Sequence, residues 1–376
     1  MTSLLWLLLL AGGGALLPSL YSQTGKQHVL LAPLLLALGY GLSPAALGFV
    51  TTGAAADMQP ALQMAVAWLA LAAGLQVLET RTWRRHNGVL AKQLMTNILA
   101  AAWSGLGVGA VLVIAQLGLT TSHTWRMPEI LREPEVNGLL WGWGCLVAGT
   151  QRRMRPADQV FLGCLGLVLL CSFDGNMLGW TALLVVGCAG IVGLLGNPTT
   201  STSLKDPAWP IRTAVLIGAT ALTCGLAAQL GLPGVLVGFF VGACLKRAGL
   251  VPATQCRQVA ASVRSVHVVT LVLVGLSLRV ALTHILWGIA LGVVLLCMRL
   301  VWEHSQHRVR GGGRRIGILV REDNAGRCIW LAASLLFVTH RSILAQALLP
   351  IMAIAVILSD ISLWSLRDFA PTRQKA

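Results

Sequence analysis

The sequence predicts an all-α polytopic membrane protein, and three observations lead to that prediction. Of its 376 residues, 56% are hydrophobic and only 11% are charged, whereas soluble globular domains are nearer half apolar and a quarter charged. The apolar residues gather in runs of about 15–25 residues, the length of helix that crosses a bilayer core. The basic residues fall in short clusters between these runs. This composition excludes an ordinary soluble enzyme, a disordered chain and a disulfide scaffold.

About thirteen apolar runs are expected to be membrane spans. They cover residues 3–20, 29–50, 61–79, 93–117, 137–150, 159–176, 177–196, 211–230, 233–245, 265–281, 284–302, 328–340 and 342–364. The first run has no basic residue before it and no evident cleavage site, so we expect a span there and not a signal peptide. The stretch 159–196 is divided at Asp174. A division near Gly187 is the alternative, and it would place Asp174 deep in a helix.

The charge distribution orients the chain. The net charge is +15, from 28 Lys and Arg against 13 Asp and Glu. With thirteen spans, every basic cluster falls on one side of the membrane, as cytoplasmic loops do. We therefore expect an outer N-terminus, a short cytoplasmic tail at 367–376, and a location in a plasma membrane of the bacterial inner type. The basic clusters are explained by topology, so we expect no nucleic-acid partner.

Among the ionisable residues inside apolar runs, Asp174 and Arg299 are the main candidates for chemistry, because a charge there costs about 2.5–3.5 kcal/mol on insertion scales. Asp174 has apolar residues on both sides and could bind a proton and a metal cation alternately. Its neighbours also form an Asp-Gly-Asn sequence, which is typical of a turn. Arg299 lies near the end of its run, where it is either a charge in the core or a side chain that extends to the membrane surface.

Glycines recur at four-residue spacing at Gly234, Gly238 and Gly242. In a membrane, this spacing lets a second helix pack closely. The nine cysteines lie mostly inside apolar runs without any C-x-x-C pair, so we interpret them as small buried side chains and not as disulfides or metal ligands. The stretch 316–327 starts apolar, becomes charged at Glu322 and Asp323, and is followed by another apolar run. Such an interruption marks an ion site in many transporters, and a cytoplasmic loop is the alternative.

Several segments, in order along the chain, resemble the monovalent cation:proton antiporter family, the Kef-like and sodium–proton exchanger group. Residues 39–44 read GYGLSP, 67–76 read AWLALAAGLQ, 229–242 read QLGLPGVLVGFFVG and 274–278 read VGLSL. These resemble, respectively, the family's early G-x-x-x-G-P element, its GLE-containing span, its GaFlaG element and its vGl element. Gln76 stands where the family motif has Glu.

The resemblance implies an architecture of antiporter-like inverted repeats with two crossed, broken helices. A transmembrane domain would cover residues 1–366, with scaffold spans at about 1–79 and 211–302 and core spans at about 93–196 and 316–364. It implies a homodimer that exchanges H⁺ for Na⁺ or K⁺, is not an enzyme, and carries no cofactor and no metal beyond the transported cation.

The resemblance also implies roles for individual residues. Asp174 falls at the family's essential acid, and Arg299 falls where many members carry a basic core residue. Glu322 and Asp323 fall on the second unwound helix, and Thr150 falls on the first. The stretch 147–153 lacks the acid and the proline that the family keeps around that threonine. This departure, with Gln76, supports an alternative function: a transport-inactive subunit or sensor with the antiporter fold.

Overall fold

The computed structural model describes residues 28–51, 58–77, 160, 164, 175–196, 209–309, 349–359 and 361–362. These residues form helices joined by turns, and no strand occurs among them, so the predicted all-α class is confirmed for this part of the chain. The helices are α2 (His28–Leu42), α4 (Gln59–Val77), α8 (Gly175–Gly196), α9 (Trp209–Gln229), α10 (Gly234–Arg247), α11 (Ala253–Ser277) and α12 (Leu282–Val309), with a further helical segment at Leu349–Ser359.

Each of these helices overlaps an apolar run of the sequence, and the largest differences from the predicted boundaries occur in α2, α11 and α12. Helix α12 continues to Val309, although its apolar run ends at residue 302. Helix α2 ends at Leu42, although the run continues to residue 50. The chain turns there because Ser43 precedes Pro44, and a residue before proline avoids the helical conformation. Helix α11 begins at Ala253, well before the predicted start at residue 265. Charged residues limit the apolar run on its N-terminal side, but a charged side chain does not prevent the backbone from forming a helix.

The turns between α9, α10 and α11 are short and follow one plan. Gly231 and Gly249 have φ of +68° and +69°, a left-handed conformation that glycine adopts without steric cost and that commonly ends a helix. Pro233 and Pro252 then stand at the N-cap positions of α10 and α11. The residue after each glycine donates its backbone N–H to the preceding helix, Leu232 to Ala227 at 2.8 Å and Leu250 to Leu245 at 3.1 Å. Both connections are therefore tight turns that backbone hydrogen bonds close onto the preceding helix.

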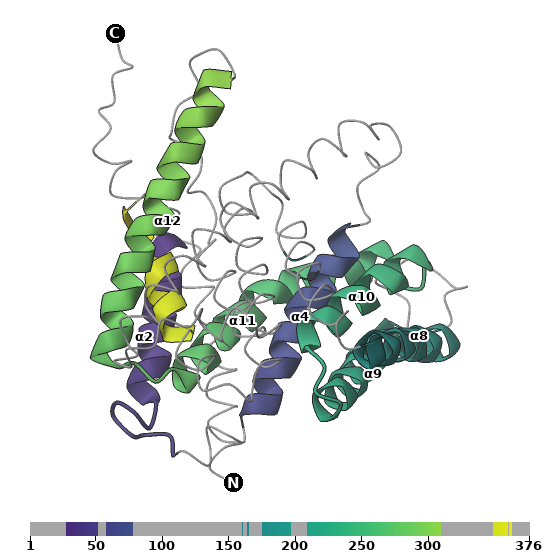
Figure 1. Ribbon diagram of the computed structural model, residues 1–376. Coiled ribbons are helices and arrows are strands. Elements are labelled where there is room, and N and C mark those ends of the chain that lie inside the picture. Colours follow the sequence, from purple (N-terminus) through teal and green to yellow (C-terminus); the bar gives the residue numbers. More distant parts are fainter. Residues whose placement is uncertain are drawn as a thin grey trace.

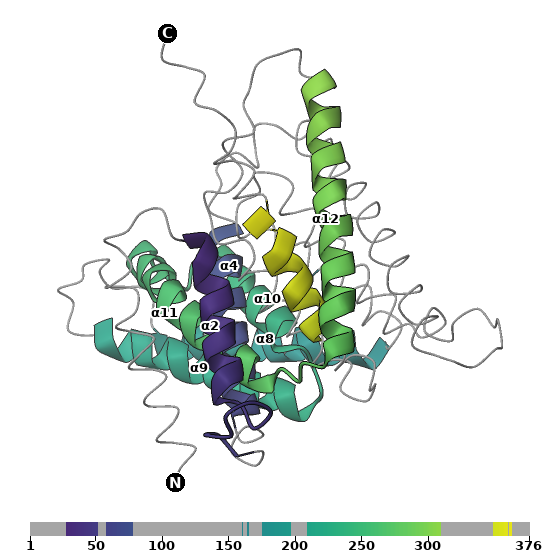
Figure 2. The same cartoon turned by 90° about the vertical axis from the view of Figure 1, so that its left-hand side faces the viewer.

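The described helices are arranged around α4, α10 and α11 (Figure 1). Helices α8 and α9 lie on one side of this group, and α2, α12 and segment 349–359 lie on the other. The view turned by 90° again shows segment 349–359 beside α12 (Figure 2). The long helix α12 extends beyond its neighbours in both views.

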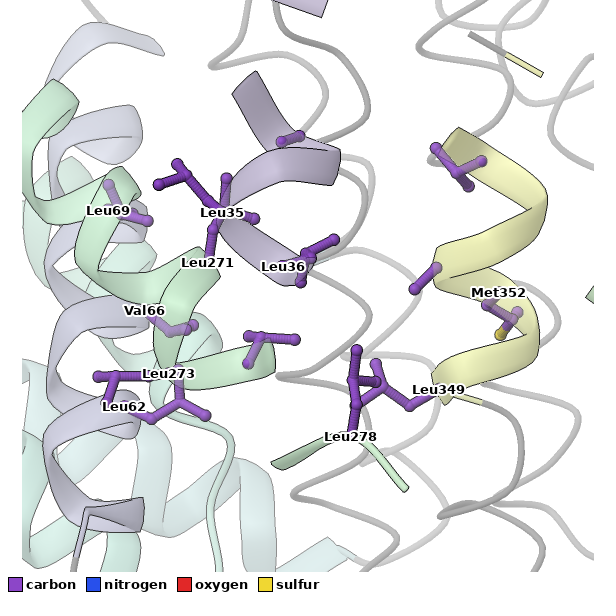
Figure 3. Close-up of a cluster of buried hydrophobic side chains, with 14 of the residues drawn as sticks. Leu35, Leu36, Leu62, Val66, Leu69, Leu271, Leu273, Leu278, Leu349 and Met352 are labelled. Atoms are coloured by element: carbon purple, nitrogen blue, oxygen red, sulfur yellow. The ribbon is translucent and has the colours of Figure 1, made fainter. Parts of the chain in front are cut away.

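One buried hydrophobic cluster joins α2, α4, α11 and segment 349–359 (Figure 3). Leu35 of α2, Val66 of α4 and Leu271 of α11 are each at most 3% exposed. Leu278, directly after α11, lies beside Leu349 of segment 349–359. A second cluster joins α4 and α10 to α8 and α9, through side chains that include Leu71, Val241, Leu184 and Leu216. Both clusters include residues of α4, α10 and α11, so these helices connect the two sides of the molecule.

In the part of the chain that the structure describes, one helix, α11, is long and apolar enough to cross a membrane. About half of its most apolar stretch is buried against other helices. Shorter apolar segments occur at Ala32–Leu42, Gly179–Val192, Thr213–Gln229, Leu282–Cys297 and Leu349–Ser359.

Candidate functional site

Most of the residues predicted to carry chemistry fall outside the described part of the chain. Thr150, Asp174, Glu322 and Asp323 lie there, and α8 begins at the residue after Asp174. Arg299 belongs to α12. The structure therefore gives no geometry for the predicted ion site. What it describes in detail is a set of close contacts between helices.

The predicted glycine stripe contacts α4. A methyl group added at Gly234 would come within 3.1 Å of the Gln63 carbonyl oxygen, and one added at Gly238 would overlap the Ala67 backbone. One added at Gly242 would meet the backbone of Leu71. The two backbones therefore touch without side chains between them, as the four-residue spacing predicted. Because residues of increasing number face one another in the same order, α4 and α10 run in the same direction.

Helix α4 contributes its own glycine to this contact. A Cβ at Gly74 would meet the backbone of Phe239 and would come within 2.9 Å of the Ala243 nitrogen. Gly74 belongs to the GLQ sequence, and Phe239 belongs to the GFFVG sequence. Two of the segments that resemble the antiporter family therefore contact each other.

The other two resembling segments also contact each other. A Cβ at Gly39 of α2 would come within 2.9 Å of the Gly275 Cα in α11, and a Cβ at Gly275 would come equally close to the Gly39 Cα. The contact is reciprocal and leaves no room for a side chain on either helix. Most glycines in these four segments thus serve helix packing, whereas Gly41 has no such contact and Gly231 lies in the turn after α9.

A third close contact was not predicted from the sequence. Gly288 and Gly292 of α12 pack on segment 349–359, where Ile354 and Ala355 face them. A Cβ at Gly288 would lie 2.7 Å from the Ile354 Cβ, and one at Gly292 would lie 3.1 Å from the Ala355 carbonyl oxygen. The sequence did contain a signal for this contact, because these glycines have the same four-residue spacing as the stripe in α10. The order of contacts again places the two helices in the same direction.

Polar side chains of α11 face inward near α4. The indole nitrogen of Trp68 in α4 donates a hydrogen bond of 2.9 Å to the Ser262 hydroxyl, which donates in turn to the Val259 carbonyl at 2.8 Å. Gln255 is only 4% exposed. Its side-chain nitrogen and the Gln258 side-chain oxygen are both buried without a hydrogen-bond partner in the structure. Spacings of three and four residues put Gln255, Gln258 and Ser262 on one face of the helix, a polar stripe that the sequence analysis overlooked.

Within the described residues, no group of three His, Cys, Asp or Glu side chains is placed to hold a metal ion. The six described cysteines, Cys164, Cys188, Cys224, Cys244, Cys256 and Cys297, form no disulfide. Lys246, in the last turn of α10, donates to the Cys256 sulfur at 3.7 Å, which ties the end of α10 to the start of α11. Among the described residues, side-chain hydrogen bonds thus join α4 to α11 and the end of α10 to the start of α11.

Comparison with known proteins adds no relative: no family model, no curated protein and no solved structure matches this chain.

Proposed function

We propose that this chain is a polytopic membrane protein that exchanges H⁺ for Na⁺ or K⁺. The observation that carries the proposal is the pairing of the four segments that resemble the antiporter family. The segment with Gly74 contacts the one with Gly242, and the segment with Gly39 contacts the one with Gly275. Sequence resemblance alone does not require such contacts. Their presence supports one common fold in which these segments form a scaffold.

The helix directions also support an alternating topology. In the thirteen-span prediction, 61–79 and 233–245 are the third and ninth spans, so they should cross the membrane in the same direction. The contacts between α4 and α10 have that direction. The eleventh and thirteenth spans, 284–302 and 342–364, should also be parallel, as are α12 and segment 349–359.

In the proposed mechanism, Asp174 is a carboxylate that binds either a proton or a cation. Because one carboxylate cannot bind both, release of a proton on one side of the membrane lets a cation bind there. Thr150 would supply an oxygen ligand, and Glu322 and Asp323 would lie at the second broken helix. Movement of the core spans against the scaffold would then expose the site to each side in turn. Arg299 would offset the negative charge of the core, and two copies of the chain would form a dimer.

The decisive experiment is proton-coupled cation flux in proteoliposomes, with Na⁺ and K⁺ offered separately. We expect Asp174→Asn to reduce flux to the protein-free background, because asparagine keeps the size of the side chain but cannot be charged. The protein should still insert and elute as a single species. Asp158→Asn is the matched control, since Asp158 precedes the apolar run 159–176, and it should keep the wild-type flux.

Three other outcomes have definite meanings. Normal flux in Asp174→Asn would refute the mechanism. Well-folded wild-type protein without flux for either cation would support the transport-inactive subunit, which Gln76 and the altered stretch 147–153 favour. If Asp174 lies in a turn, an impermeant reagent should label Asp174→Cys from outside the cell, and the substitution should change little else.

A further inference from the structure

A histidine side chain bonds to the short connection between α11 and α12. Residues 278–281 make this connection, and we call them the α11–α12 joint. Figure 1 shows α12 rising from the joint, away from the group around α11. The Nδ1 atom of His284 lies 3.2 Å from the Ala281 backbone nitrogen and 3.2 Å from the Arg279 carbonyl oxygen. A single side-chain atom thus reaches both a donor and an acceptor of the joint.

The bond to Ala281 has the arrangement of a helix cap. Ala281 directly precedes α12, and its methyl side chain cannot accept a hydrogen bond from the first turn. His284 is the third residue of α12, the position from which a side chain reaches back to the backbone N–H of the residue before the helix. The Ala281 carbonyl in turn accepts the N–H groups of His284 and Ile285, at 3.0 and 3.2 Å. His284 and Ala281 therefore close the first turn of α12 on each other.

The two contacts of Nδ1 exclude each other. An imidazole nitrogen without a proton accepts a hydrogen bond, and one with a proton donates. A neutral imidazole can keep its proton on Nε2 and leave Nδ1 able to accept from the Ala281 N–H. The imidazolium has a proton on both nitrogens, so its Nδ1 can donate to the Arg279 carbonyl but cannot accept from Ala281. The charged form of His284 is thus incompatible with the cap.

Protonation also adds a positive charge at the start of α12. The first turn of a helix carries a partial positive charge from its N–H groups, which repels a cation. Loss of the cap and this repulsion act in the same direction, because both favour an open first turn. His284 is only partly buried, so protons from the solvent can reach it. Histidine is also the side chain that changes its charge between about pH 5 and pH 8.

Among the described residues, Arg279 and Tyr40 are the other ionisable side chains close to the joint. Arg279 is exposed, and an arginine stays protonated in proteins. The Tyr40 backbone nitrogen lies 3.1 Å from the place of a Cβ on Gly275, near the end of α11, and a tyrosine side chain cannot become positively charged. No Asp, Glu, Lys, Arg or His occurs in the described stretches that pack here, 268–277, 285–296 and 349–359.

We propose that His284 is a pH-sensitive cap of the α11–α12 joint. The neutral imidazole accepts from Ala281 and keeps the first turn of α12 closed. In the protonated imidazole, Nδ1 donates to the Arg279 carbonyl instead, and the first turn opens. In the thirteen-span prediction the joint lies on the outer side of the membrane, so the cap would respond to the external pH. The device works through backbone partners and does not depend on ion exchange at Asp174.

Hydrogen–deuterium exchange of the full chain in detergent tests this proposal, with mass spectrometry of peptides that cover 278–286. Exchange is compared at about pH 8 and about pH 5.5, on either side of the histidine range, after correction for the intrinsic pH dependence of amide exchange. A helix cap changes the opening equilibrium about fivefold. We therefore expect the protection of these amides to fall about fivefold at the lower pH. A peptide from α10, at the seam with α4, should keep its protection at both.

His284→Gln separates capping from charge. Glutamine is favoured at this helix position because its side chain can accept from the same N–H, and it does not gain a proton. We expect strong protection of the joint at both pH values. His284→Ala has no acceptor and should be weakly protected at both. His267→Gln is the matched control, because it removes a histidine of α11 that lies ten residues before the end of that helix, and it should respond to pH like the wild type.

The proposal is wrong if the wild-type joint is equally protected at both pH values, or if His284→Gln keeps the pH response. An equal loss of protection in the α10 peptide would also overturn it, because acid would then be loosening the whole molecule. Should His284→Ala fail to fold, the wild type and the glutamine variant still decide the question.

Discussion

Two helix pairs in this molecule contain many glycines and use them differently. In the pair α4–α10, Gly74, Gly238 and Gly242 bring the two backbones into contact. In the pair α8–α9, glycines such as Gly187 and Gly218 have no atom within 4 Å of the position a Cβ would take. There the contact is made by larger side chains, including Leu184 and Leu216. Glycine content alone therefore does not identify a helix interface.

The outer surface of α8 and α9 sharpens this contrast. Leu183, Val186 and Leu194 of α8 are 61%, 68% and 86% exposed, and Leu222 of α9 is 55% exposed. In water such a surface would be unfavourable, but in a bilayer it is the surface that contacts lipid. The glycines of α8 and α9 thus lie on an apolar outer face, while those of α4 and α10 lie at an internal seam.

The largest expected effect is at that seam. Gly238→Ala would place its methyl group against the backbone of Ala67, with the Ala67 Cα at 3.0 Å and its carbonyl carbon at 2.9 Å. Overpacking of this kind costs about 3 kcal/mol, and the better helix propensity of alanine returns about 1 kcal/mol. We expect a net loss of about 2 kcal/mol in unfolding free energy, measured as a lower apparent unfolding temperature in detergent. A variant as stable as the wild type would mean that α4 and α10 do not touch there.

An intermediate effect is expected where α4 joins α11. Ser262→Ala removes the acceptor of the Trp68 indole N–H, and Trp68→Phe removes the donor. Interhelical hydrogen bonds in membrane proteins contribute about 0.6 kcal/mol on average, so the coupling energy from a double-mutant cycle should be about 0.6–1 kcal/mol. The two single variants, each compared with the double variant, separate this coupling from lost packing of the Trp68 ring. Strictly additive effects would show that the bond contributes nothing.

The smallest effect is expected on the outer face. Gly187→Ala adds a methyl group into open space in α8, so stability should be unchanged or should rise by up to about 1 kcal/mol through helix propensity. Gly218→Ala in α9 is the parallel variant and should behave alike. A clear loss of stability in both variants, by the same thermal measurement, would reveal that another surface packs on this face in the assembled protein.

The sequence predicted much of the fold because its signals are local. Helices α8 and α9 begin and end within two residues of the apolar runs 177–196 and 211–230, since a change from apolar to polar residues marks most of the ends. The predicted start of α11 at residue 265 was wrong for a related reason, because the helix begins at Ala253. Its arginines indicate exposure, whereas helix formation depends on backbone hydrogen bonds that a polar residue also permits. The candidate ion-site residues could be selected from the free-energy cost of a charge inside an apolar run and from the resemblance to the antiporter family. The roles of Asp174 and its partners remain predictions.

The helical, highly apolar character of this chain follows from composition and run length alone, because both are properties of consecutive residues. The sequence also determined that Gly234, Gly238 and Gly242 form a stripe suited to close packing, because four-residue spacing puts them on one face. The three-dimensional arrangement of the helices was needed to show that the stripe contacts α4, that Gly39 packs against Gly275, and that a Cβ at Gly187 would have no atom within 4 Å. A glycine permits a close approach in every direction, and which helix makes that approach depends on how all the helices share the space around them.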